Sequence, residues 1–558
     1  MKKTFFTLLC LAGMALTGSA QTDDTVEVSV INEVDTVWNF GYKGVNLFSR
    51  QMHRIDIAYP STDQNGEDVT LSGYVCIPSE IYSGAQPCDG ILLYNHYTQT
   101  HAGGAPTRGY SVGEDFVMAN PLKPNYIVVC SDYLGFGITE GRNQVFCFGD
   151  ANGQASIDCL LAARQLLDNR GISQGRFTIN AGYSSGGYDA LGAQRVRDMK
   201  YRDQVQFHKT LVGGMPFDVM SAYRTFIDWQ NDASVDATCL PMVLDVFNRE
   251  GKLGYTYDEM FKEPLASKFE KWFLSGQYPM AAVMDSMEGV TLAECVQEKF
   301  LDRSSEEFQK LKELATAHSL TNGWTPDSTQ RYFSMHLLRD SVVPVQSGRA
   351  FINFLTDFDY DGQKCQGYKR SIIPERTRLQ TNYFLPLKQH TIAGGMVFYL
   401  TLAATLTATP VLYYDGELNT HYADLVEPAT LMGIIHLLEE KGIDVKGTVQ
   451  QLMASDEGSG ASSGGFFSFM LSVEEKLKSI GTSTAEVLQI LLDSGIEMSD
   501  ILEAYDYFTS EASEVKTATG DADQKTAQAM EPFLTDYYQH SLLKWLRENN
   551  VNIFEDND

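Results

Sequence analysis

The feature that most constrains the fold of this chain is a regular alternation of apolar runs and helical patterns between residues 90 and 219. The segments 153–169 and 185–199 read as helices, and in the first of them the apolar residues recur at helical spacing. Strands that alternate with helices favour a mostly parallel sheet covered on both faces, so the predicted fold class is α/β. Four apolar runs around these helices read as strands: GILLYN (90–95), NYIVVCSDYLGFG (125–137), RFTINAG (176–182) and KTLVGGMPFDV (209–219).

The same rhythm is absent from residues 220–329, which read as helices and loops rich in Met, Phe, Tyr and Trp. Strand-like runs separated by turns occupy 26–81, and strand patterns resume at 331–340 and 381–389. We therefore expect a helical cap to interrupt the sheet domain. The expected boundaries are 21–219 and 330–426 for the two parts of the core and 220–329 for the cap.

Both ends of the chain have patterns of their own. Residues 1–20 combine Lys2 and Lys3 with an apolar run and small residues at the end, which predicts a cleavable signal peptide and a secreted or periplasmic bacterial protein. Residues 427–558 read as a helical C-terminal extension, interrupted by a flexible linker at 454–465.

Charge and hydropathy limit the partners. The formal net charge of −29 argues against binding nucleic acid or an anionic bilayer through bulk electrostatics. The uncharged stretch 391–414 is long enough to span a membrane, but its four threonines and Pro410 favour a helix packed on the sheet. We therefore expect no transmembrane segment in the mature chain and no nucleic-acid partner.

The sequence Gly-Tyr-Ser-Ser-Gly at 182–186 matches G-x-S-x-G, the nucleophile elbow. A second match, centred on Ser462, lies in the polar linker with no strand before it. The first follows a strand and begins a helix, as the elbow requires. This context favours a catalytic serine at 182–186 over a plain glycine-rich turn.

Ser184 is the better nucleophile of the two adjacent serines. The turn needs small residues two before and two after the nucleophile, and Ser184 has Gly182 and Gly186 there. For Ser185 the earlier position would be Tyr183, which would clash. We expect the Ser185 backbone N–H to form half of an oxyanion hole.

A serine nucleophile needs a base and an acid, in the chain order serine, acid, histidine. Asp340 follows the strand in MHLLRDSVVPV and is the favoured acid. His390 follows the strand in NYFLPLKQH and is the favoured base; His421 is the alternative, and His336 reads as a core residue. The alternative acids sit later, in a turn: Asp357, Asp359 and Asp361.

The second oxyanion donor is expected from ILLYNHYTQTH, the loop after a core strand. Thr98 is the favoured backbone donor and Tyr97 the next. His96 and His101 in the same loop lack the further spacing that a metal site requires, so we predict no metal there.

Two other patterns are weaker. Residues 357–362 match the start of a calcium-binding loop, but the twelfth position of that loop is Tyr368, where a glutamate is needed. We therefore interpret these residues as an acidic turn and predict no cofactor. The cysteines are scattered without CxxC pairs; among them, Cys76 and Cys88 are the first pair to test for a disulfide.

Taken together, YIVVCSDYLGFG, GQASIDCLLAAR, GYSSGG, LLRDSVVPV and LKQH resemble the α/β-hydrolase superfamily, and within it the secretory lipase family of capped serine hydrolases. The resemblance covers roughly residues 70–425. It implies a cofactor-independent ester hydrolase with a Ser-Asp-His triad and a helical cap, and a small-molecule or lipid ester as its substrate. A serine peptidase on the same fold and a non-catalytic surface binding protein are the alternatives, and the ordered triad argues against the second.

Overall fold

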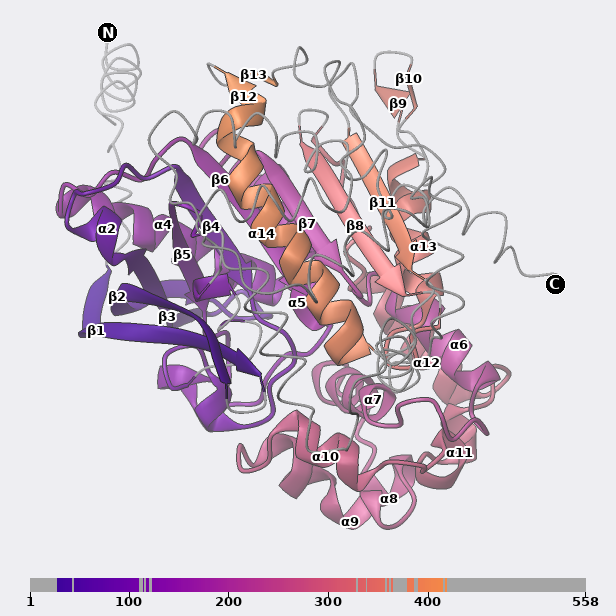
Figure 1. The fold of residues 1–558 in the computed structure, drawn as a ribbon. Helices are drawn as coiled ribbons and strands as arrows, with labels where there is room; N and C mark the ends of the chain where they lie inside the picture. Colours follow the sequence, from indigo (N-terminus) through magenta and orange to yellow (C-terminus); the bar gives the residue numbers. More distant parts are fainter. Residues whose placement is uncertain are drawn as a thin grey trace, which may run out of the picture.

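The structure is a computed structural model (Figure 1). The residues that it describes are 28–42, 45–109, 114, 117–119, 123–327, 330–337, 339–356, 359–360, 363–364, 379–385, 390–414 and 417–418. The predicted signal peptide, the C-terminal extension with its linker, His421 and Ser462 lie outside these residues.

A nine-stranded sheet forms the centre of the described fold, with the strand order β1-β2-β3-β5-β4-β6-β7-β8-β11. The six strands from β5 to β11 run parallel, whereas β1, β2 and β3 are antiparallel. The fold is therefore α/β with a mostly parallel sheet, as predicted. The strands are β1 (Ser29–Tyr42), β2 (Val45–Thr62), β3 (Asp68–Pro78), β4 (Gly90–Asn95), β5 (Tyr126–Ser131), β6 (Phe177–Tyr183), β7 (Lys209–Gly213), β8 (Arg331–Leu337) and β11 (Leu379–Leu385).

Each central strand is buried on both faces, because its side chains alternate between two hydrophobic clusters. In β4, Ile91 and Leu93 join the cluster under α4 (Ala151–Asn169) and α5 (Ser185–Lys200). Leu92 and Tyr94 join the cluster under α14 (Gly395–Leu412). This two-sided burial explains why the strand reads as a continuous apolar run.

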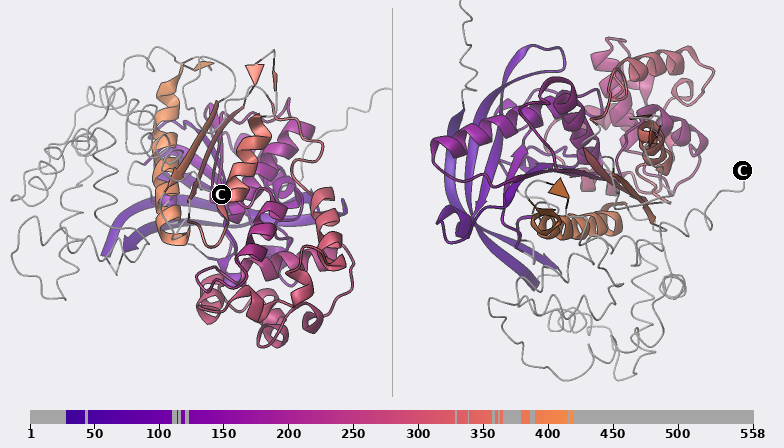
Figure 2. Two further views of the ribbon diagram at one scale, coloured as in Figure 1. Left: turned by 90° about the vertical axis from the view of Figure 1, so that its right-hand side faces the viewer. Right: turned by 90° about the horizontal axis from the view of Figure 1, so that it is seen from above.

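Helices cover both faces of the sheet (Figures 1 and 2). The views in Figure 2 place α14 on one face and α4, α5 and α13 (Val345–Thr356) on the other. Most of the uncharged stretch at 391–414 is thus a helix packed on the sheet, as expected. Among the described residues, no helix is long and apolar enough to cross a membrane.

A group of short helices lies between β7 and β8 in the sequence. Figure 1 shows them beyond the ends to which the arrows of β7, β8 and β11 point, which are the carboxyl ends of these strands. The carboxyl ends of parallel strands are where α/β sheets bind ligands. These helices are α6 (Val219–Asp228), α7 (Cys239–Glu250), α8 (Tyr257–Met260), α9 (Leu265–Phe269), α10 (Met280–Ser286), α11 (Leu292–Cys295) and α12 (Glu306–Ala317).

The remaining described elements are short and lie outside the central sheet. They are α2 (Ser79–Tyr82), the 3₁₀ turns η1 (Ala102–Gly104), η2 (Gly137–Thr139) and η4 (Glu298–Phe300), the π-helical turns η3 (Glu270–Leu274) and η5 (His390–Gly394), and the two-residue strands β9 (Asp359–Tyr360), β10 (Gln363–Lys364), β12 (Tyr413–Tyr414) and β13 (Glu417–Leu418).

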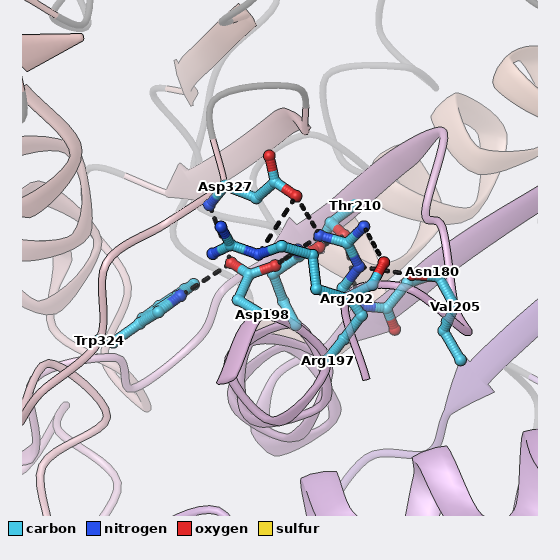
Figure 3. A network of polar contacts seen from close by, with 9 residues as sticks. Asn180, Arg197, Asp198, Arg202, Val205, Thr210, Trp324 and Asp327 are labelled. Carbon is cyan, nitrogen blue, oxygen red and sulfur yellow. Dashed lines mark hydrogen bonds and ion pairs between the residues drawn. The ribbon is translucent and has the colours of Figure 1, made fainter. Parts of the chain in front are cut away.

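A buried polar network anchors the segment after α12 to helix α5 (Figure 3). Arg197 donates to Asp198 Oδ1 at 3.0 Å and to Asp327 Oδ2 at 2.5 Å. The indole Nε1 of Trp324 donates to Asp198 Oδ2 at 2.9 Å. Each buried charge thus has an opposite charge and hydrogen bonds, which offsets the cost of removing it from water.

The structure does not contain the disulfide that we singled out. Cys76 and Cys88 are both free thiols, and Cys76 is fully buried in the sheet. Burial raises the pKa of both thiols, so they stay protonated at neutral pH. Cys76 therefore acts as a small hydrophobic side chain of the core.

Candidate active site

Ser184 lies in a sharp turn between β6 and α5. Its backbone has φ 59° and ψ −130°, a conformation that residues other than glycine rarely adopt. A Cβ at Gly182 would lie 2.0 Å from the Gly186 carbonyl oxygen, and a Cβ at Gly186 would lie 2.2 Å from that of Asn95. The turn therefore needs glycine at both positions, which is the steric condition that the sequence analysis used.

Three side chains that are far apart in the sequence form one hydrogen-bonded row. His390 Nε2 lies 2.9 Å from Ser184 Oγ, and His390 Nδ1 lies 2.6 Å from Asp340 Oδ2. His390 and Asp340 are 5% and 1% exposed, so water screens the row little. The structure thus brings together the three residues that we selected as nucleophile, base and acid.

The backbone holds the Asp340 carboxylate in place. Its Oδ1 accepts hydrogen bonds from the N–H groups of Val342 and Val343, both at 2.9 Å. Its Oδ2 therefore faces His390, which fixes Nδ1 of the imidazole as the donor and leaves Nε2 free to accept from Ser184. This is the tautomer that a general base needs.

Tyr183 is a site residue that the sequence analysis did not select for any role. Its hydroxyl donates to the backbone carbonyl of His390 at 2.7 Å, and its ring lies 5.1 Å from the imidazole, centroid to centroid. The side chain of Tyr183 is buried. The residue next to Ser184 therefore also supports His390.

His336 lies behind the row. It is buried at 2% exposure, with Nε2 2.8 Å from the Val343 carbonyl oxygen and 3.9 Å from Asp340 Oδ2. Burial lowers the pKa of His336, so its imidazole stays neutral. The prediction that His336 is a core residue is confirmed.

Thr98 and Ser185 lie side by side near Ser184. Thr98 Oγ1 donates to Ser185 Oγ at 3.0 Å, which joins the loop after β4 to the start of α5. Ser185 is the first residue of α5, so its own backbone N–H has no acceptor within the helix. The start of a helix favours a negatively charged oxygen, which this N–H could bind.

His96 has a structural place in the loop. Its two ring nitrogens lie 2.9 Å from the Tyr97 carbonyl oxygen and 3.4 Å from that of Asp132, and its ring packs 4.5 Å from that of Tyr133. Within the described residues, no group of three or more His, Cys, Asp or Glu side chains is arranged to hold a metal ion. Of the predicted acidic turn, Asp357, Asp361 and Tyr368 lie outside the described residues.

Asp132 is a second residue that the sequence analysis missed. Its carboxylate accepts from the Ser72 hydroxyl at 2.5 Å and from the N–H and hydroxyl of Thr107 at 2.8 and 2.5 Å. Thr107 belongs to the segment that follows Thr98, so this buried carboxylate ties that segment to the end of β5. Its position at the end of the apolar run IVVCSD was the only signal in the sequence.

Two small cavities flank this region. The first, with a volume of about 30 Å³, is lined almost wholly by apolar atoms from α6, α7 and residues 342–344, which follow Asp340. The second, of about 20 Å³, is half polar and is lined by residues that include Tyr97, Thr98 and Ser185. One cavity therefore suits an apolar group and the other a polar one.

Comparisons with known proteins agree with this geometry. Residues 104–252 match the secretory lipase family. A search of curated proteins finds no significant match. Among solved structures, the rice cell wall degrading esterase LipA from Xanthomonas oryzae is 16% identical with a TM-score of 0.52, over 68% of this chain and 96% of LipA.

A protein from Legionella pneumophila subsp. pneumophila str. Philadelphia 1 is 15% identical with a TM-score of 0.54, over 68% of this chain and 98% of its own. At this sequence identity, the two structures support the fold, and the family match supports the activity. The chain is therefore a carboxylic ester hydrolase with the α/β-hydrolase fold, similar to the secretory lipases in residues 104–252.

Proposed function

We propose that this protein is a secreted serine hydrolase that cleaves carboxylic esters through an acyl-enzyme, with Ser184 as nucleophile, His390 as base and Asp340 as the orienting acid. The observation that supports this proposal most is the position of the His390 imidazole, 2.9 Å from Ser184 Oγ and 2.6 Å from Asp340 Oδ2. A serine hydroxyl is a weak nucleophile at neutral pH, and this arrangement supplies the base that activates it.

The proposed reaction has two acyl-transfer steps. His390 Nε2 removes the Ser184 proton as Oγ attacks the ester carbonyl, and the imidazolium then protonates the leaving alcohol. Water, deprotonated by His390, attacks the acyl-enzyme in the same way and releases the acid. Asp340 orients the imidazole and stabilises the imidazolium.

The oxyanion of each tetrahedral intermediate is proposed to be held by the backbone N–H groups of Ser185 and Thr98. The position of Ser185 at the start of α5 and its contact with Thr98 support this assignment. Donors fixed before the reaction stabilise the developing charge without reorganisation, and losing one such donor costs roughly 10²–10³ in kcat.

We infer that residues 220–329 act as a cap that contributes to substrate choice. Their helices lie at the carboxyl ends of the strands (Figure 1), and α6 and α7 line the apolar cavity next to residues 342–344. An apolar wall near the triad suits the acyl chain of a lipid or other apolar ester. Substitution of Trp229 or Trp272 tests this inference through the ratio of kcat/KM between short and long esters.

The location outside the cytoplasm of a bacterium is part of the proposal and rests on the pattern of residues 1–20 and on the secretory family match. The net charge of −29 supports a small ester substrate rather than nucleic acid.

A fluorophosphonate probe and a substrate panel test the proposed function together. We expect the probe to label the wild-type chain and the Ser462→Ala control, but not Ser184→Ala. We also expect p-nitrophenyl esters to be cleaved faster than aminoacyl-anilides. Faster anilide cleavage would favour a serine peptidase, and absence of labelling would favour a binding protein.

A further inference from the structure

The half-polar cavity of about 20 Å³ adjoins the proposed oxyanion site. Its polar lining includes Thr98 and Ser185 on one side and Asn152 and Asp189 on another, and Phe136 adds an apolar wall. About 10–15 Å³ of such volume holds one water molecule, so the cavity has room for one small polar group. A group in it would lie against the two residues proposed to bind the oxyanion.

Asp189 is the acidic residue among those that line this cavity. It lies in α5, five residues after Ser184, and its side chain is buried, with 5% of the residue exposed. Its Oδ1 accepts a hydrogen bond from Asn152 Nδ2 at 3.2 Å. Within the described residues, this is the only hydrogen bond of the carboxyl group, and no Arg or Lys pairs with it.

This arrangement leaves the carboxyl group able to bind a further partner. A carboxyl group has acceptor capacity at both oxygens, and within the described residues Asp189 uses only Oδ1. Burial also raises the pKa of Asp189 to about 8, since it disfavours the charged form. A largely neutral carboxyl group in a polar cavity is suited to exchange hydrogen bonds with an uncharged polar group.

Other buried carboxylates of this chain show the contrast. Asp132 accepts three hydrogen bonds from Ser72 and Thr107, and Asp198 is paired with Arg197 and Trp324. Asp189 has one hydrogen bond and faces a cavity. The difference points to a partner that arrives with the substrate.

We propose that this cavity is a subsite for a hydroxyl group of the ester substrate, and that Asp189 is the residue that selects it. A hydroxyl group both donates and accepts hydrogen bonds, so it matches a carboxyl group, and one hydroxyl fits the volume. The inference rests on the proposed function, because it assumes that the ester is held at Ser184. It narrows the substrate class to esters that have a hydroxyl group near the scissile bond.

The test compares matched esters that differ by one hydroxyl group. One arm uses p-nitrophenyl butyrate, 2-hydroxybutyrate and 3-hydroxybutyrate, and places the hydroxyl on the acyl part. The other arm uses ethyl and 2-hydroxyethyl butyrate, and places it on the alcohol part. The readout is the ratio of kcat/KM between hydroxylated and plain esters, in which intrinsic reactivity cancels when variants are compared.

We expect the wild-type chain to favour the hydroxylated ester in one arm, and Asp189→Ala to reduce that ratio about tenfold or more, because a site built for a hydroxyl rejects analogues that lack it. Asp189→Asn keeps a hydrogen-bonding group of the same size and should retain part of the preference. The matched control is Asp158→Asn, which changes a half-buried carboxyl group bonded to Ser61 and Gln154 and outside the residues that line the cavity.

Two failures are distinguishable. If the ratio is the same in wild type, Asp189→Ala and Asp189→Asn in both arms while activity still depends on Ser184, the cavity holds only water and the inference is wrong. If Ser184→Ala retains activity on the plain esters, the proposed function itself fails. Circular dichroism of each variant verifies that it folds. If Asp189→Ala does not fold, Asp189→Asn still tests the inference.

Discussion

The hydroxyl of Tyr183 donates a 2.7 Å hydrogen bond to the backbone carbonyl of His390, so the residue before the proposed nucleophile also positions the proposed base. The two residues are 207 positions apart in the chain. Any change in this contact is expected to move the imidazole relative to Ser184, and reacting groups tolerate little displacement.

Tyr183→Phe tests this positioning role, because it removes the hydroxyl and keeps the ring. One hydrogen bond is worth about 1 kcal/mol, which corresponds to roughly a fivefold loss of kcat. We expect KM to change less than kcat, since Tyr183 is buried behind the imidazole. An unchanged kcat in a variant of wild-type stability would show that Tyr183 only fills space.

Gly186→Ala is expected to prevent correct folding of the elbow. The added Cβ would lie 2.2 Å from the Asn95 carbonyl oxygen, a main-chain atom that cannot move without distorting β4. The matched control is Gly192→Ala in the same helix, whose Cβ would meet its nearest neighbour at 3.4 Å. Thermal unfolding should show a much lower Tm for Gly186→Ala, and a Tm equal to or above wild type for Gly192→Ala. Equal Tm values for both variants would contradict the steric account.

The Asp189 carboxyl group should also affect how stability depends on pH. Its pKa is about 8 in the folded state and about 4 in an unfolded chain, so between these values the folded state binds one more proton. The free energy of unfolding should therefore fall as pH rises from 5 to 8, because the proton that favours the folded state is lost. Tyr133, Cys147 and Tyr188 nearby have pKa values raised by burial and stay neutral in this range.

Denaturant unfolding of wild type and Asp189→Asn at pH 5 and pH 8 checks this sign. Other titrating groups cancel in the difference between the two proteins. We expect the free energy of unfolding of Asp189→Asn, measured relative to that of wild type, to be higher at pH 8 than at pH 5. A difference that does not change with pH would mean that Asp189 is ionised in the folded protein.

The network of Figure 3 predicts a large effect of Asp198→Ala on stability. This change removes a carboxylate that accepts from Arg197 and Trp324, and leaves buried donors without an acceptor. Breaking a buried pair in this way costs roughly 3–5 kcal/mol. Lys310→Ala, which breaks an exposed pair with Glu306, should leave the unfolding transition unchanged. Similar transitions for both variants would contradict the role of the network.

Much of the core could be predicted from local patterns. The run at 90–95 is β4 (Gly90–Asn95) with the same bounds, because a strand buried on both faces is apolar throughout. The strand patterns at 209–219 and 331–340 end earlier, at Gly213 and Leu337, since a sequence pattern does not mark where pairing stops. Gly214, with φ 53°, leaves the extended region directly after β7.

The elbow could also be predicted, because its requirement for small side chains concerns residues that lie within two positions of Ser184 in the sequence. The roles of Tyr183 and Asp189 could not. Tyr183 bonds a backbone carbonyl, which has no sequence signature, and the burial of Asp189 depends on how α5 packs against Asn152 of α4. Long-range packing of this kind decides which polar residues of a helix face a cavity.

The most direct test of the proposed role of Ser184 is the kcat of Ser184→Ala on a p-nitrophenyl ester. Ser462→Ala, which changes the other G-x-S-x-G match, is the control. Because Ser184 Oγ lies 2.9 Å from Nε2 of His390, the base proposed to activate it, we predict a loss on the order of 10⁴-fold or more for Ser184→Ala. We predict wild-type activity for Ser462→Ala. A Ser184→Ala protein with near-normal kcat would contradict the account.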